Sequence, residues 1–92
     1  MAQARAHVLI AGYVQGVFFR ANTREMADFY KLTGWAKNTQ AGEVEAVFEG
    51  DEENIKSMIQ WCHKGPDGAG VKEVEVKWEK PTGEFKIFHI RY

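Results

Sequence analysis

The sequence has one cysteine, Cys62, and only two prolines, Pro66 and Pro81, in its 92 residues. A single cysteine cannot close an intramolecular disulfide, so the chain lacks the disulfide framework of small exported proteins and a cytoplasmic location is predicted. Both prolines fall in turn-like stretches, and no linker is indicated. Because 92 residues are too few for two independent domains, we predict a single domain spanning residues 1–92.

The chain also lacks a large excess of either positive or negative charge, and it lacks long hydrophobic runs. Twelve Lys and Arg against thirteen Asp and Glu give a net charge of −1, which offers no general attraction to nucleic acid or to an acidic membrane. The longest apolar stretch, Val8 to Val14 interrupted by Gly12, is far shorter than the roughly 18 residues that a membrane-spanning helix needs. We therefore expect no nucleic-acid partner and no membrane, and any anion must be bound locally.

Hydrophobic patterning predicts two helices and five strands, with a strand at each end of the chain. Helical spacing of apolar residues indicates a first helix over 21–33, ended by Gly34, and a second helix capped by Asp51 and ended at Gly65. Continuous or alternating apolar runs indicate strands over 7–11, 35–38, 44–48, 71–80 and 85–92.

This order of elements predicts an α+β fold of the ferredoxin-like type. Strand, helix, strand, strand, helix, strand form the βαββαβ sandwich, in which two helices pack on one face of a mostly antiparallel sheet. An extra C-terminal strand is expected beyond this unit. On the third strand Glu43, Glu45 and Glu49 alternate with apolar residues, and we expect them to form a solvated face.

The cysteine and the histidines do not indicate a catalytic or metal-binding site. Cys62 falls on the apolar stripe of the second helix, which favours a buried small hydrophobe over a nucleophile. The histidines His7, His63 and His89 are spread over different elements without clustered cysteines or carboxylates at ligand spacing. We predict no metal site and no cofactor.

The segment from Tyr13 to Arg20 joins the first strand directly to the first helix. Backbone N–H groups at such a junction converge where the helix dipole is positive, which favours an anion. Gly16 permits positive φ or the close approach of a ligand, and the planar fork of Arg20 matches two phosphate oxygens. The segment lacks the residues of a P-loop or a dinucleotide fingerprint, so ATP and NAD are poor candidates. Taken singly, these residues also fit an ordinary turn with an exposed arginine.

Two long motifs in this order resemble the signatures of the acylphosphatase family. The first is Gly12-Tyr13-Val14-Gln15-Gly16-Val17-Phe18-Phe19-Arg20, and the second is Gly34-Trp35-Ala36-Lys37-Asn38-Thr39-Gln40-Ala41-Gly42-Glu43-Val44-Glu45. The resemblance covers nearly the whole chain, and that family has the ferredoxin-like fold. One departure stands out, since the family commonly has Asp where this chain has Ala41. We expect that Asp to serve the turn, so its loss affects the rigidity of the hairpin more than the reaction.

The resemblance implies hydrolysis of an acyl phosphate to a carboxylate and inorganic phosphate, without metal or covalent intermediate. It implies that Arg20 grips the phosphate and that Asn38 orients the attacking water. The phosphate cradle it implies is the backbone of Gln15, Gly16, Val17, Phe18, Phe19 and Arg20. The expected partners are the acyl phosphate and inorganic phosphate, and the chain is expected to act as a monomer.

An alternative remains a non-catalytic ferredoxin-like module that binds an anion or RNA. RNA-binding members of this fold stack bases on aromatic residues of the central strands, whereas Phe18 and Phe19 fall in the loop. Strand directions add one further expectation. The final strand must run toward the edge of the sheet that carries Arg20. We therefore predict that the Tyr92 carboxylate lies close enough to pair with Arg20, or to hold it in its binding rotamer, when no phosphate is bound.

Overall fold

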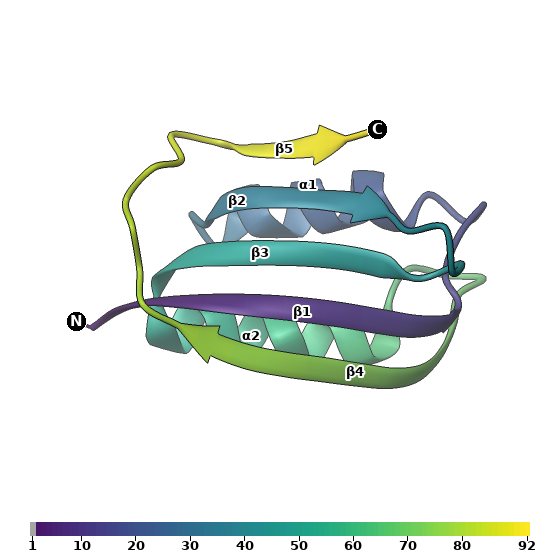
Figure 1. Cartoon of the computed structure of the whole chain (residues 1–92). Coiled ribbons are helices and arrows are strands. Elements are labelled where there is room, and N and C mark those ends of the chain that lie inside the picture. Colours follow the sequence, from purple (N-terminus) through teal and green to yellow (C-terminus); the bar gives the residue numbers. More distant parts are fainter. Residues whose placement is uncertain (1) are drawn as a thin grey trace.

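Five strands form one sheet, and two helices cover one of its faces, in the computed structural model (Figure 1). The structure describes residues 2–92. The elements in chain order are β1 (Gln3–Tyr13), α1 (Phe19–Phe29), β2 (Thr33–Asn38), β3 (Val44–Asp51), α2 (Glu52–Lys64), β4 (Gly70–Glu79) and β5 (Phe88–Arg91).

The strand order in the sheet is β4-β1-β3-β2-β5. Strand β1 pairs antiparallel with β3 and with β4, and β2 pairs antiparallel with β3. Strand β5 adds to the outer edge of β2 in parallel. The predicted ferredoxin-like βαββαβ fold with an extra C-terminal strand is therefore confirmed, and the parallel pair explains why the sheet is mostly and not wholly antiparallel.

The alternation along β1 divides its side chains between the two faces of the sheet. Ala4, Ala6, Val8 and Ile10 are buried under the helices, while the intervening residues are partly exposed on the open face. Helix α2 adds Ile55, Met58 and Cys62 to the same core cluster. Burying one such aliphatic side chain contributes about 1.5–3 kcal/mol, so this shared face holds the helices on the sheet.

Helix α1 starts and ends earlier than the sequence pattern predicts. It spans Phe19–Phe29 and not 21–33, and the left-handed residue that follows it is Lys31, with φ of 58°, not Gly34. Thr33 and Gly34 already belong to β2, where a side chain at Gly34 would collide with the carbonyl of Val47. Gly34 therefore allows β3 to approach β2 closely, and it does not end helix α1 as the sequence pattern predicts.

The final strand is shorter than predicted, because the chain must first cross the end of the sheet. Strand β4 lies at one edge and β5 at the other, and residues 80–87 connect them (Figure 1). Regular pairing begins at Phe88, opposite Gly34, and covers Phe88–Arg91 instead of 85–92. The aromatic and aliphatic residues before Phe88 belong to the crossing segment.

Glu49 contradicts the expectation that the glutamates of β3 form a solvated face. It is 5% exposed and accepts hydrogen bonds from the backbone N–H groups of Thr82 (3.1 Å) and Gly83 (3.0 Å), and its carboxylate pairs with Arg5 at 2.9 Å. Burial alone would raise the pKa of Glu49, but these hydrogen bonds outweigh it and lower the pKa. Glu49 therefore anchors the segment that crosses from β4 to β5.

The second helix follows its prediction closely. The Asp51 side chain accepts a hydrogen bond from the Glu53 N–H at 2.9 Å, and the helix ends at Gly65 with φ of 70°. Cys62 is fully buried, and burial raises the pKa of its thiol to about 12, so it is an apolar core residue as expected. No helix within residues 2–92 is long and apolar enough to span a membrane.

Candidate active site

The loop between β1 and α1 has a backbone suited to holding an anion. Gly16 has φ of 78° and Phe18 has φ of 58°, whereas Gln15 and Val17 are not among the positive-φ residues. Alternation of this kind turns successive N–H groups toward one concave side of the chain. A non-glycine residue in the left-handed region is conformationally costly, so its presence at Phe18 marks a backbone that the surrounding packing imposes.

The first turn of α1 leaves its N–H groups without a capping side chain. Its N-cap residue is Phe18, which cannot accept a hydrogen bond through its side chain, and the turn contains no acidic residue. Helix α2 provides the contrast, since Asp51 caps it and Glu52 and Glu53 occupy its first turn. The positive end of the α2 dipole is thus complemented by its own carboxylates, while that of α1 remains available to an external anion.

Phe19 anchors this loop to the core. Its ring is 2% exposed and lies 5.6 Å from the ring of Trp61 on α2. The ring also lies so close to Gly65 that a side chain at this glycine would press against it. The contact fixes the start of α1, which carries Arg20, against the end of α2.

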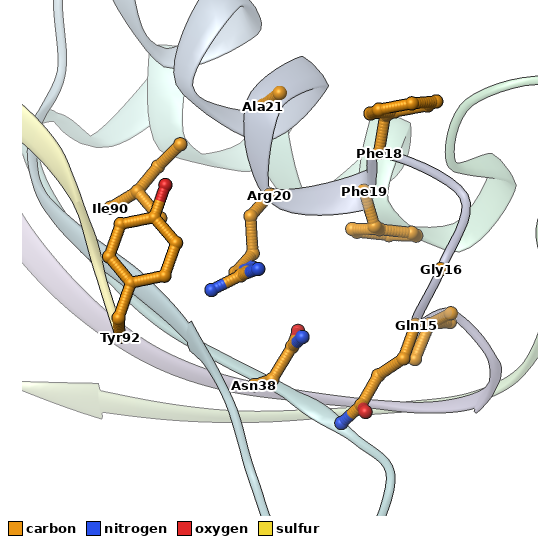
Figure 2. A pocket seen from close by; sticks show the side chains of 10 residues that line it. Gln15, Gly16, Phe18, Phe19, Arg20, Ala21, Asn38, Ile90 and Tyr92 are labelled. Carbon is orange, nitrogen blue, oxygen red and sulfur yellow. The ribbon is translucent and has the colours of Figure 1, made fainter.

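A cavity of about 300 Å³ lies between this loop, the end of β2 and the end of β5. Figure 2 shows Arg20 and Asn38 extending toward one another across it from α1 and β2. Among the lining residues within 2–92, Arg20 alone has a charged side chain, and it brings a positive charge to the cavity of a chain whose net charge is −1. The lining residues are Val14, Gln15, Gly16, Phe18, Phe19, Arg20, Ala21, Asn38, Ile90 and Tyr92.

The Arg20 guanidinium is held by the end of β5. Its Nη1 donates a hydrogen bond to the carbonyl of Arg91 at 3.2 Å, and its Cζ lies 4.8 Å from the centre of the Tyr92 ring. The expectation that the chain ends beside Arg20 is confirmed. The predicted partner atom is wrong, because Arg20 forms no ion pair within residues 2–92 and contacts a backbone carbonyl and a ring instead of the Tyr92 carboxylate.

Asn38 occupies the last position of β2, immediately before the hairpin turn. Its backbone pairs with Val44, and its side-chain amide forms no hydrogen bond with another group among residues 2–92. An unused amide offers both a donor and an acceptor at the cavity wall. It can therefore orient a small polar molecule such as water.

The structure brings together most of the site residues expected from the sequence. The side chain of Val17 packs against the core and lines a different hollow, beside Trp61, which leaves its backbone as the part predicted to contact the phosphate. Sequence reasoning missed the lining residues Val14, Ala21 and Ile90. Ile90 reaches the cavity because β5 pairs in parallel with β2, which places it opposite Ala36, two residues before Asn38.

Polar groups elsewhere are arranged for structure. Within residues 2–92 no group of three or more His, Cys, Asp or Glu side chains could hold a metal ion. His7 instead pairs with Glu45 on the open face of the sheet, with 2.6 Å between Nε2 and the carboxylate. Glu45 is accordingly half-buried and not simply solvated.

Comparisons with known proteins give a consistent family assignment. The sequence profile described as Acylphosphatase matches residues 6–90. A protein named acylphosphatase from Pelotomaculum thermopropionicum is 48% identical over 92 residues, which is 100% of each chain, and one from a Roseiflexus species is 51% identical over 98% of this chain and 97% of its own.

The solved structure of an acylphosphatase from Coxiella burnetii superposes with a TM-score of 0.92 at 36% sequence identity. The match covers 97% of this chain and 93% of that one, so it includes the sheet, both helices and the loop between β1 and α1. Together with the full-length sequence relatives, this confirms the resemblance seen in the two motifs. The chain belongs to the acylphosphatase family of enzymes.

Proposed function

We propose that the chain hydrolyses acyl phosphates to a carboxylate and inorganic phosphate in the cavity between α1, β2 and β5. The observation that carries the proposal is that Arg20 and Asn38 face one another across this cavity, next to the uncapped start of α1 (Figure 2). One side of the cavity thus offers positive charge and backbone donors, and the other offers a neutral amide. Those are the two functions that transfer of a phosphoryl group to water requires.

The phosphoryl group would bind to the backbone N–H groups of residues 15–20 and to the Arg20 guanidinium. The left-handed conformations of Gly16 and Phe18 support this, because they point successive N–H groups to one side. The guanidinium donates one of its five N–H groups to the Arg91 carbonyl, so the others can bond to phosphate oxygens. Removing one such preorganised donor typically costs about 2.7–4 kcal/mol of transition-state stabilisation.

Asn38 would orient the attacking water. A side-chain amide does not titrate near neutral pH, so it cannot remove a proton. It can orient the water through a hydrogen bond that its oxygen accepts from the water or that its NH₂ group donates to the water oxygen. In the reaction the water oxygen bonds to phosphorus, and the bond from phosphorus to the carboxyl oxygen breaks with its electron pair on the carboxylate. One proton of the water passes to a phosphoryl oxygen, and the other stays on the attacking oxygen, which gives dihydrogen phosphate.

The site needs no general acid for the leaving group. A carboxylate is stable at neutral pH, so it departs unprotonated. Within residues 2–92 no aspartate, glutamate or histidine side chain lines the cavity. Positioning and electrostatic stabilisation then supply the catalysis, which is typical of phosphoryl transfer. We propose that the reaction uses neither a metal ion nor a cofactor, so a chelator should leave the rate unchanged.

The open face of the sheet argues against the alternative of an RNA-binding module. Such modules stack bases on exposed aromatic side chains of the central strands. On this face Trp35 is 9% exposed, and the Arg91 guanidinium (4.5 Å from the ring centre) and the Lys37 ammonium (5.7 Å) lie over it. Trp35 therefore offers no open ring face on which a base could stack.

We further propose that the enzyme works as a monomer in the cytoplasm, with the acyl phosphate and inorganic phosphate as its only small-molecule partners. The buried, unpaired thiol of Cys62 fits a reducing compartment. Arg20 and Asn38 reach the same cavity within a single chain, so the proposed catalysis would not require a second copy. Sedimentation equilibrium at the assay concentration tests this, and a turnover rate that rises with protein association would contradict it.

The decisive experiment is an assay with benzoyl phosphate, whose hydrolysis is followed by absorbance. We expect rapid release of benzoate and phosphate by the purified chain, competitive inhibition by inorganic phosphate, and no hydrolysis of a phosphate monoester, whose alkoxide leaving group needs a proton donor. Binding of inorganic phosphate without turnover would favour the alternative of a non-catalytic anion-binding module.

A further inference from the structure

The side chain of Gln15 leaves the phosphate loop and reaches the hairpin between β2 and β3. Its Nε2 donates a hydrogen bond to the carbonyl of Thr39 at 2.9 Å and another to the carbonyl of Glu43 at 3.0 Å. Both partners are acceptors only, so the NH₂ group with its two donors must face them. Figure 2 shows this amide pointing away from Arg20, on the far side of Asn38. The amide of the side chain therefore bonds to the hairpin, although the residue also lines the cavity.

The two carbonyls that Gln15 contacts are the ones that close the hairpin turn. The Thr39 carbonyl also accepts from the Gly42 N–H at 3.2 Å, and the Glu43 carbonyl also accepts from the Thr39 N–H at 2.9 Å. A third bond runs from the Glu43 N–H to the Thr39 hydroxyl at 3.1 Å. Each carbonyl oxygen thus accepts one hydrogen bond from within the turn and one from Gln15. The two bonds occupy both lone pairs of that oxygen.

Residue 41 gives this turn no polar support. Ala41 is exposed and has no side-chain atom that can form a hydrogen bond, whereas an aspartate there could bond to the backbone of its own turn. The side-chain hydrogen bonds that hold the turn come from Thr39 and, across the site, from Gln15. The rigidity of the hairpin therefore depends on a residue of the phosphate loop.

Asn38 stands next to these bonds in the chain. It is the last residue of β2. The next residue, Thr39, donates its N–H to the Glu43 carbonyl and accepts a hydrogen bond from the Gln15 amide at its own carbonyl. A displacement of about 1 Å at a reacting group can lower a rate by about a hundredfold. The hydrogen bonds from the Gln15 side chain to the hairpin thus affect the position of Asn38 relative to the bound phosphate, on which the rate depends.

We propose that Gln15 is a positioning residue whose side-chain amide fixes Asn38 relative to the phosphate loop. Its backbone belongs to the loop, while its side chain sets the distance between the loop and the hairpin. The inference rests on the function proposed above, since it assumes that Asn38 orients the attacking water. The inference adds the requirement that the phosphate loop and the hairpin keep a fixed spacing, which phosphate binding alone does not need.

The test compares Gln15→Met with Gln40→Met. Met keeps the length of the side chain and removes both donors, and Gln40 is exposed at the tip of the same hairpin and forms no side-chain hydrogen bond within residues 2–92. We expect Gln15→Met to lower kcat for benzoyl phosphate about tenfold and to leave the inhibition constant of inorganic phosphate within twofold of wild type. Gln40→Met should change neither. A parallel loss of phosphate affinity in Gln15→Met would overturn the proposal, because Gln15 would then shape the phosphate loop itself.

A double-mutant cycle with Asn38→Ala separates positioning from a general structural role. If Gln15 acts through Asn38, Gln15→Met should change kcat less than twofold once Asn38 is already Ala. The same tenfold loss in both backgrounds would overturn the inference while leaving the proposed role of Asn38 intact. If Asn38→Ala alone left kcat unchanged, the proposed function of Asn38 and the inference would fall together.

A second variant and a second measurement guard against loss of folding. Gln15→Glu is isosteric but directs a carboxylate at two carbonyls, so it should lower kcat at least as much as Gln15→Met, with Gln40→Glu as the control for its charge. Amide hydrogen exchange in the folded protein should accelerate at Thr39 and Gly42 in the Gln15 variants and stay at wild-type rates in the Gln40 variants. Unchanged exchange at both amides would show that Gln15 does not hold the turn and would overturn the proposal.

Discussion

Arg20 Nη1 donates a hydrogen bond to the backbone carbonyl of Arg91, so the principal cation of the cavity is held by the last strand of the sheet. Because this bond is to a backbone atom, it survives any change of side chain at Arg91. The Tyr92 ring adds a second contact, 4.8 Å from the Arg20 guanidinium carbon. Strand β5 therefore completes the site, although it lies outside the βαββαβ unit.

Deletion of Arg91 and Tyr92 should weaken phosphate binding several-fold. The deletion removes both contacts of the guanidinium, which then samples other rotamers and must be ordered again by the phosphate. The loss of stability should stay near 1 kcal/mol, because both residues are exposed. Inhibition by inorganic phosphate and denaturant unfolding measure the two effects.

Arg91→Ala is the matched control for this truncation. It keeps the Arg91 carbonyl and the Tyr92 ring, so phosphate affinity should remain near that of wild type even though the contact of the Arg91 guanidinium with Trp35 is lost. Equal weakening in Arg91→Ala and in the truncation would assign the effect to the side chain of Arg91. An unchanged site in the truncation would show that β5 does not hold Arg20.

Arg20→Ala should abolish both hydrolysis and inhibition by inorganic phosphate, since the same guanidinium would contact the ground state and the transition state. Arg20→Lys should restore little, because an ammonium cannot form the two parallel bonds of a guanidinium. Arg24→Ala, exposed one turn further along the same helix, controls for the lost charge. Near-normal turnover in Arg20→Ala would remove Arg20 from the site.

Asn38→Ala should lower kcat by at least about a hundredfold and leave the affinity for inorganic phosphate nearly unchanged, because only the orientation of water is lost. Steady-state kinetics with inorganic phosphate as inhibitor give both values. Asn54→Ala on α2, away from the cavity, should match wild type in both. If Asn38→Ala weakened phosphate binding as strongly as Arg20→Ala, Asn38 would be a phosphate ligand or a structural support.

Local patterns in the sequence predicted the elements and their order well. The capped helix α2 follows from Asp51, the acidic first turn and the Gly65 stop, all of which act within a few residues. The strand directions then placed the C-terminus beside Arg20. The loop from Tyr13 to Arg20 is different, because a glycine and an arginine at a strand-to-helix junction also fit an ordinary turn. Its identification as a phosphate loop rests on the resemblance of the two motifs to the acylphosphatase family.

The features that the sequence did not reveal depend on contacts between distant residues. Glu49 has the spacing of an exposed strand residue, but the segment around Thr82 folds over it and buries it. Gly34 resembles a helix stop, yet it is needed for the close approach of Val47 in the neighbouring strand. The bonds of the Gln15 side chain likewise join residues 24 and 28 positions apart, which no local pattern encodes.

Glu49→Gln should remove part of the acid sensitivity of the fold. The pKa of Glu49 in the folded protein is lowered, because hydrogen bonds from the Thr82 and Gly83 amides and from Arg5 outweigh the opposing effect of burial. Its ionised form therefore stabilises the fold fully above the unfolded pKa of about 4.5, and this contribution is lost as the pH falls through the lowered pKa of the folded state.

At neutral pH we expect Glu49→Gln to lower the free energy of unfolding by about 1–3 kcal/mol, because one partner of a buried hydrogen-bond network is changed. The difference from wild type should then narrow as the pH falls below about 4.5, since the wild-type carboxylate becomes protonated and loses its advantage. Urea unfolding between pH 7 and pH 3 measures it, with Glu73→Gln, exposed on β4, as the control. A difference that stays constant over this whole range would show that the charge of Glu49 does not hold the crossing segment in place.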